Sequence, residues 1–157
     1  MGKTMYPRYL LDIVVKNQTN IKNSYILKFR MEDQPEKVNN KIYISPFLRE
    51  VITENPLKQL TRTYPIDMIY PKLNAYYSMI EIPSGYKVDF LPAKDKIANE
   101  MFELEYSASV INDKVHVMLN YYFKIPVYDA TEYSKLKYYF NEIMIKGSEK
   151  IVFVKIK

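Results

Sequence analysis

A long alternation of apolar and polar residues constrains the fold of this chain more strongly than any other feature of its sequence. Apolar side chains stand at every second position from residue 102 to 110, and again from 115 to 123. A period of two is that of a β-strand with one buried face. The Asn112-Asp113 pair between the two runs is a two-residue loop that accepts positive φ angles. We therefore predict an antiparallel hairpin of two long strands.

Shorter strands are predicted on both sides of this hairpin. The chain carries 16 Tyr and 7 Phe, and tyrosine suits the half-buried, pleated surface of a sheet. Pro83-Ser84-Gly85 predicts a tight turn followed by a returning strand, because proline presets φ and glycine supplies a left-handed position. The predicted short strands cover residues 10–16, 25–31, 41–44, 66–69, 75–82, 87–91 and 151–156.

One amphipathic helix is predicted near the end of the chain. Asp129 and Glu132 have the spacing of a capping box, which predicts a helix start at Asp129. Gly147 predicts its end, since glycine commonly follows the last helical residue. The apolar stripe between them, at helical spacing, consists of Tyr133, Leu136, Phe140, Ile143 and Met144.

Together these elements predict a mostly β fold, an antiparallel two-sheet β-sandwich with one C-terminal amphipathic helix. No helix is predicted between consecutive strands, which argues against a parallel α/β architecture. A length of 157 residues suits one domain with a real core. We expect a single β-sandwich-like domain over residues 1–157.

The chain offers few groups for catalysis. It has no cysteine and one histidine, so a thiol nucleophile is absent and a zinc site would need carboxylates almost alone. His116 falls on the outward face of its predicted strand. Glu103 and Glu105, two positions apart, both fall on the solvent-facing side of theirs. We therefore expect no enzyme activity, no catalytic or metal-ligating residue and no cofactor.

The charge pattern is typical of a solvated surface. The net charge of +5 is spread along the chain without a run of five basic residues, so nucleic acid is not an expected partner. No apolar run approaches the roughly 20 residues that span a bilayer, and no membrane span is predicted. The first six residues lack the apolar core of a signal peptide.

Exposed tyrosines are the candidates for an interaction surface. Tyr122, Tyr138 and Tyr139 lie in two dense aromatic clusters, where they either pack at the edge of the core or form an exposed platform. Such a platform would stack sugars or another polymer, and a stand-alone glycan- or polymer-binding module is the alternative function.

Two stretches of the chain resemble a known family. The first carries Ile-Tyr-Ile-Ser-Pro-Phe-Leu at 42–48, Asn-Pro-Leu at 55–57 and Arg-Thr-Tyr-Pro-Ile-Asp at 62–67. The second carries Glu-Ile-Pro-Ser-Gly-Tyr-Lys-Val at 81–88, then Leu91-Pro92 and later Glu132-Tyr133. These motifs resemble the C-terminal domain, of unknown function, of bacterial transglutaminase-like proteins of the cell envelope. The turn reads Ile-Pro-Ser-Gly-Tyr where the family has a Leu-Pro-x-Gly-Tyr pattern.

The resemblance implies a non-catalytic accessory domain. In such proteins this β-rich module follows a papain-like core that holds a Cys-His-Asp arrangement, and none of this chain aligns with that core. It implies that the chain is a C-terminal domain excised from a longer, periplasmic, envelope or secreted protein. The implied partner is the neighbouring transglutaminase-like domain of the same parent chain, or an envelope protein or glycan. We expect an apolar docking patch in the proline-rich stretch near Tyr64 and Tyr70.

Overall fold

The computed structural model divides the chain into two compact units, Met1–Pro35 and Glu36–Lys157. In the first unit, strands β1 (Leu10–Lys16) and β2 (Ile26–Met31) form an antiparallel two-stranded sheet. The single-domain interpretation of the whole chain stays a prediction, and the description below concerns the second unit. The structure describes residues 10–17, 19, 22, 26–31, 35–48 and 50–156.

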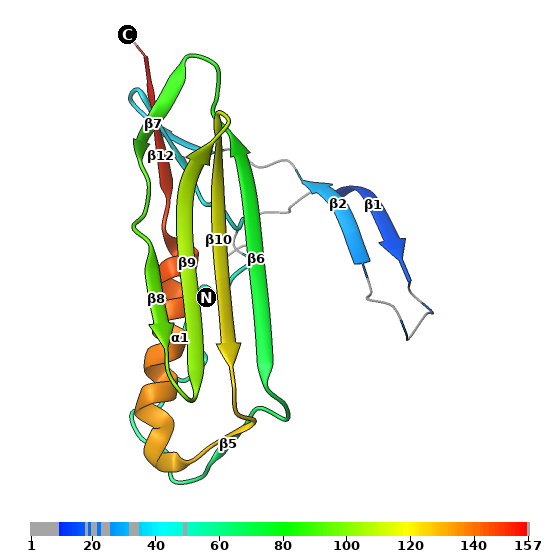
Figure 1. Cartoon of the computed structure of the whole chain (residues 1–157), viewed down its shortest axis with the longest axis vertical. Helices are drawn as coiled ribbons and strands as arrows, with labels where there is room; N and C mark the ends of the chain where they lie inside the picture. The colour runs from blue at the N-terminus through cyan, green and yellow to red at the C-terminus, as the bar shows by residue number, and fades with distance from the viewer. Residues whose placement is uncertain are drawn as a thin grey trace, which may run out of the picture. The chain divides into compact units, whose positions relative to one another are not determined.

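The predicted long hairpin forms the middle of a four-stranded sheet. We call it the larger sheet, because three of its strands have ten residues each. Asn112 and Asp113 both have positive φ angles, of 48° and 57°, and the flanking residues Ile111 and Lys114 are paired. The sheet is antiparallel throughout, with strand order β6-β10-β9-β8 (Figure 1). Its strands are β6 (Lys72–Glu81), β8 (Asp95–Ala98), β9 (Phe102–Ile111) and β10 (Lys114–Phe123).

A second antiparallel sheet joins segments that are far apart in the sequence. Its strand order is β3-β4-β12-β7, so the last strand lies between strands from the beginning and the middle of the unit. These strands are β3 (Glu36–Val38), β4 (Lys41–Ile44), β7 (Tyr86–Phe90) and β12 (Ile151–Lys155). Two short strands, β5 (Ile66–Asp67) and β11 (Val127–Tyr128), form a separate pair.

The turn after β6 carries the chain from one sheet to the other. Gly85 has a φ of 80°, and Tyr86 N–H donates to the carbonyl of Pro83 at 3.0 Å, as expected for a tight turn. The strand that follows, β7, does not return alongside β6, however, because it pairs with β12. Our interpretation of the turn is confirmed, whereas the pairing that a simple hairpin would give is wrong.

Helix α1 spans Tyr133–Ser148 and follows a short 3-10 helix at Ala130–Glu132. The predicted capping box does not form, because Asp129 makes no side-chain cap hydrogen bond. Instead the Asp129 carbonyl accepts from the N–H of Glu132 at 2.9 Å and closes the 3-10 turn. The α-helix proper therefore begins later than its sequence indicated.

Gly147 lies inside the last turn of α1 rather than beyond its end, so the prediction of a C-terminal stop is wrong. A Cβ at this position would meet the side chain of Val51 at 2.4 Å, well inside van der Waals contact. Val51 is itself buried. The glycine is therefore explained by close packing of the helix against Val51.

The helix and both sheets share one hydrophobic core. Figure 1 shows α1 along one end of the larger sheet, with β12 continuing toward the other end. Buried residues of the larger sheet alternate along its long strands, as predicted, and they are Phe102, Leu104, Tyr106, Val115, Val117, Leu119, Tyr121 and Phe123. Those of the helix and the second sheet include Leu136, Tyr139, Ile143, Ile42, Ile151 and Phe153. The mostly β fold with antiparallel sheets and one C-terminal helix is confirmed.

Candidate interaction surface

The proline-rich segment 55–70 is fastened to the unit at its beginning. The Asn55 side-chain amide donates to the carbonyl of Lys137 at 2.8 Å and to Asn141 Oδ1 at 2.7 Å, both on helix α1. Further along, the Gln59 carbonyl accepts from the Tyr133 hydroxyl at 2.9 Å. These contacts hold residues 55–59 against the helix.

The end of the same segment is fastened to strand β11. Ile66 and Asp67 form strand β5 opposite β11, and Met68 N–H donates to the carbonyl of Pro126 at 2.7 Å. Ile69 has a φ of 70°, a left-handed conformation that is strained for a β-branched residue. The Asp67 carboxylate accepts from Ile69 N–H at 2.7 Å and stabilises this turn.

Between and beyond these attachments the segment exposes large apolar side chains. Tyr64 is 76% exposed and Tyr70 is 60% exposed, and Leu60 and Ile69 are exposed even further. We call these four residues the 60–70 patch. Hydrogen bonds hold the backbone at residues 55–59 and 66–69, on either side of Leu60 and Tyr64. Docking through the surface near Tyr64 and Tyr70 stays a prediction.

The three remaining candidate tyrosines do not form one platform. Tyr139 is only 5% exposed and stacks on Phe102, with ring centroids 4.4 Å apart. Helical spacing places it on the same face as Leu136 and Ile143, which faces the core. Tyr138 is half exposed, and Tyr122 alternates with the buried residues of β10 and so lies on the opposite face of the sheet. Of the two alternatives for Tyr139, packing against the core is the one that the structure shows. A role of Tyr122 or Tyr138 in an interaction stays a prediction.

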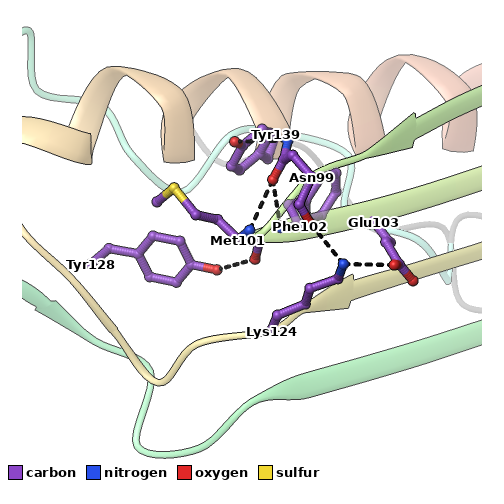
Figure 2. Close-up of polar contacts among 7 residues, drawn as sticks. All are labelled: Asn99, Met101, Phe102, Glu103, Lys124, Tyr128 and Tyr139. Atoms are coloured by element: carbon purple, nitrogen blue, oxygen red, sulfur yellow. Dashed lines mark hydrogen bonds and ion pairs between the residues drawn. The ribbon is translucent and has the colours of Figure 1, made fainter.

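A polar network at the turn between β8 and β9 provides a hydrogen-bond partner for the Tyr139 hydroxyl (Figure 2). Asn99 Oδ1 accepts from the N–H groups of Met101 and Phe102, both at 2.9 Å, and its amide donates to the Tyr139 hydroxyl at 3.2 Å. The Asn99 carbonyl accepts from Lys124 Nζ at 2.6 Å. These hydrogen bonds connect the turn to helix α1 and to the end of β10. The polar groups of the network therefore have partners within the protein.

Two of the groups singled out for possible chemistry, Glu103 and His116, have structural partners. Glu103 forms an ion pair with Lys124 at 2.6 Å. His116 Nδ1 is hydrogen-bonded to the Tyr77 hydroxyl, and the two rings are 5.9 Å apart. Within the described residues no three His, Asp or Glu side chains gather as a metal site would require.

The sequence did not predict a cluster of charged side chains around the buried Lys146, near the end of α1. Lys146 is buried, with Nζ 3.1 Å from Glu149 and 3.3 Å from Asp95, and it lies over the ring of Tyr106. Burial alone would lower the pKa of Lys146, but hydrogen bonds to Glu149 and Asp95 hold it above its ordinary value. The sequence signal was its position three residues after Ile143, on the core face. The cluster attaches the helix to β8.

The part of the chain that the structure describes contains no helix long and apolar enough to cross a membrane.

Comparison with known proteins identifies the family. A family model described as a domain of unknown function with a solved structure (DUF3858) matches residues 40–153. The chain belongs to the DUF3858 family. The match lies inside the second compact unit, so the DUF3858 domain and that unit nearly coincide. No curated protein matches the chain.

The DUF3858 fold also occurs within a longer protein. A crystal structure from Parabacteroides distasonis, described as that of a "putative protease", is similar with a TM-score of 0.59 and 11% sequence identity. The alignment covers 73% of this chain and 23% of that one. At this identity the similarity shows the fold alone. The chain thus spans less than a quarter of the length of that structure.

Proposed function

We propose that this DUF3858 domain is a non-catalytic accessory domain that follows a transglutaminase-like core in a longer parent protein. It docks on that core, or on an envelope partner, through the 60–70 patch. The observation that carries the proposal is the exposure of Leu60, Tyr64, Ile69 and Tyr70 on a backbone fastened at both ends. Exposed apolar side chains on one short segment are typical of a surface that another domain covers.

Two further observations support this function. The similar fold in Parabacteroides distasonis is part of a chain several times longer than the aligned region, which is described as a "putative protease". A papain-like core is compatible with that description. The sequence motifs at 62–67 and 81–88 resemble the domain that follows such cores, and on the same resemblance we place the parent protein in the periplasm or cell envelope.

Hydrogen exchange tests the docking. We expect the amides of residues 60–70 to exchange at least tenfold more slowly in the parent protein than in this chain alone, because the neighbouring domain covers them. A Leu60→Ser/Tyr64→Ser variant of the parent should lose that protection. The matched control is Val38→Ser, which removes an exposed apolar side chain from β3. Equal exchange in the two proteins would contradict docking by this patch.

The non-catalytic part has a separate test. The purified chain should neither hydrolyse peptides nor incorporate amines into glutamine substrates above background. Turnover that persists after purification and disappears when one of its own side chains is replaced would overturn this part of the proposal.

A glycan- or polymer-binding module is the second candidate, and one observation favours it. A shallow depression of about 370 Å³ lies beside Tyr122, between β6, β10, β9 and β8, and Lys96, Glu105 and Asn120 line it. Because Tyr139 is buried, any binding would use this depression rather than the three-tyrosine platform.

A further inference from the structure

Strand β6 is an unprotected edge of the larger sheet. It pairs with β10 on one side, and within the described residues of the second unit nothing hydrogen-bonds the backbone on its other side. An exposed strand edge is a template for another strand, and proteins that must stay monomeric protect it by short length, charge, proline or bulges. Strand β6 has ten residues in uninterrupted register, and residues 73–79 contain neither a proline nor a charge.

The other edge strands of the two four-stranded sheets carry such protection. Edge strand β8 has four residues and begins with Asp95-Lys96. Edge strand β3 has three residues and begins with Glu36-Lys37. Edge strand β7 carries Lys87 and Asp89, and its pairing with β12 contains a register irregularity. The contrast shows that β6 alone among these edges is left suitable for pairing.

The register defines which groups of β6 are available. Ile82 N–H donates to the carbonyl of Asp113, and the one-to-one pairing of β6 with β10 has no bulge. Because residues in an antiparallel ladder bond their neighbour alternately, the even-numbered residues of β6 bond β10. The N–H and C=O groups of Leu73, Ala75, Tyr77 and Met79 therefore face the free edge.

The same four residues place their side chains on one face of the sheet. Leu73, Tyr77 and Met79 are exposed, and Tyr77 is 65% exposed although its hydroxyl bonds His116. The free hydrogen-bonding groups and the exposed apolar side chains thus belong to the same residues. A partner strand would form hydrogen bonds with these backbone groups and would cover these apolar side chains.

We propose that a second copy of this chain pairs with β6 in an antiparallel arrangement and joins two four-stranded sheets into one. The pattern of β6 is self-complementary about Tyr76: Leu73 lies opposite Met79 of the second copy, and Ala75 opposite its Tyr77. Each of these pairs joins two apolar residues, and the second also sets a small residue against a large one. Both pairs unite residues whose backbone groups face the free edge, so each exchanges two main-chain hydrogen bonds. This inference is independent of the proposed function, because it uses a different surface and a different partner.

Sedimentation equilibrium of the whole chain over a range of concentrations tests this dimer. We expect a monomer–dimer equilibrium, and Met79→Lys should weaken association at least tenfold because it places a charge opposite Leu73 of the second copy. Ser107→Lys is the matched control, since it adds the same charge on β9, two strands away from the edge. A monomer at every concentration, or a dimer that Met79→Lys leaves unchanged, would overturn the proposal.

Disulfide trapping tests the register and does not depend on a lysine variant. The chain has no cysteine of its own, so a Leu73→Cys/Met79→Cys variant carries only the introduced thiols. Within one strand these positions are about 20 Å apart, too far for an internal bond. Mild oxidation should give a covalent dimer of the double variant, whereas neither single variant should form a covalent dimer. Failure of the double variant to cross-link would contradict this pairing.

Discussion

At the scale of single residues, Tyr128 links burial to a dependence on pH. Its ring is fully buried, and its hydroxyl donates to the Met101 carbonyl at 2.9 Å. Burial raises the pKa of Tyr128 to about 12 and also raises the pKa values of Tyr106 and Tyr121. The native state therefore binds these protons more tightly than the unfolded chain, whose tyrosines ionise near pH 10. This stabilisation is fully present below pH 10 and is lost as the pH rises through about 12.

We expect Tyr128→Phe to reduce the loss of stability above pH 10, because one of the raised pKa values is removed. At neutral pH the variant should lose about 1 kcal/mol of unfolding free energy, the net value of one hydrogen bond. The Met101 carbonyl keeps its bond from Lys124 N–H, so no buried acceptor is left alone. Urea unfolding at pH values from 8 to 11 measures both effects, with exposed Tyr64→Phe as control. An unchanged dependence on pH would contradict this account.

At the scale of elements, the last turn of α1 contains Gly147, although glycine is unfavourable inside a helix. Helix propensity alone favours Gly147→Ala by about 1 kcal/mol. The added Cβ, however, would lie 2.4 Å from a methyl group of Val51, whose β-branched side chain has little freedom to move. The packing effect is the larger of the two.

We therefore expect Gly147→Ala to destabilise the protein by about 1–3 kcal/mol, the usual cost of overpacking a core. The double variant Val51→Ala/Gly147→Ala should lose less unfolding free energy than the two single variants lose together. The smaller side chain at position 51 leaves room for the new methyl group. Chemical unfolding of the four proteins in this cycle measures the coupling. Additive effects would show that the contact with Val51 does not govern this position.

Elements governed by local rules could be predicted from the sequence. The hairpin of β9 and β10 was foreseen because the Asn112-Asp113 loop and the alternation beside it act within a few residues. The pairing of β7 with β12 could not be foreseen, since it joins residues 86–90 to 152–155 and no local signal marks it. Tyr64 and Tyr70 were named for a docking patch that the family resemblance implies, and that role stays a prediction. The sequence left the position of Tyr139 open, because it depends on which face of the helix meets the sheet.

At the scale of the whole molecule, every residue of the described hydrophobic core lies beyond position 40. The second unit, Glu36–Lys157, therefore has a hydrophobic core of its own. We therefore expect the fragment 36–157 to fold alone, with a cooperative thermal transition within a few degrees of that of the whole chain. Far-ultraviolet circular dichroism measures both transitions. A fragment that melts without cooperativity would show that the first unit is needed.

The position of β12 between β4 and β7 determines when the domain can be completed during synthesis. A ribosome makes Lys41–Ile44 more than one hundred residues before Ile151–Lys155, yet these strands are direct neighbours. Until the last strand leaves the exit tunnel, β4 and β7 have no central partner and the core beneath them stays open. The nascent chain thus exposes apolar strands until Ile151–Lys155 has emerged, and we expect its tendency to aggregate to fall only from that point.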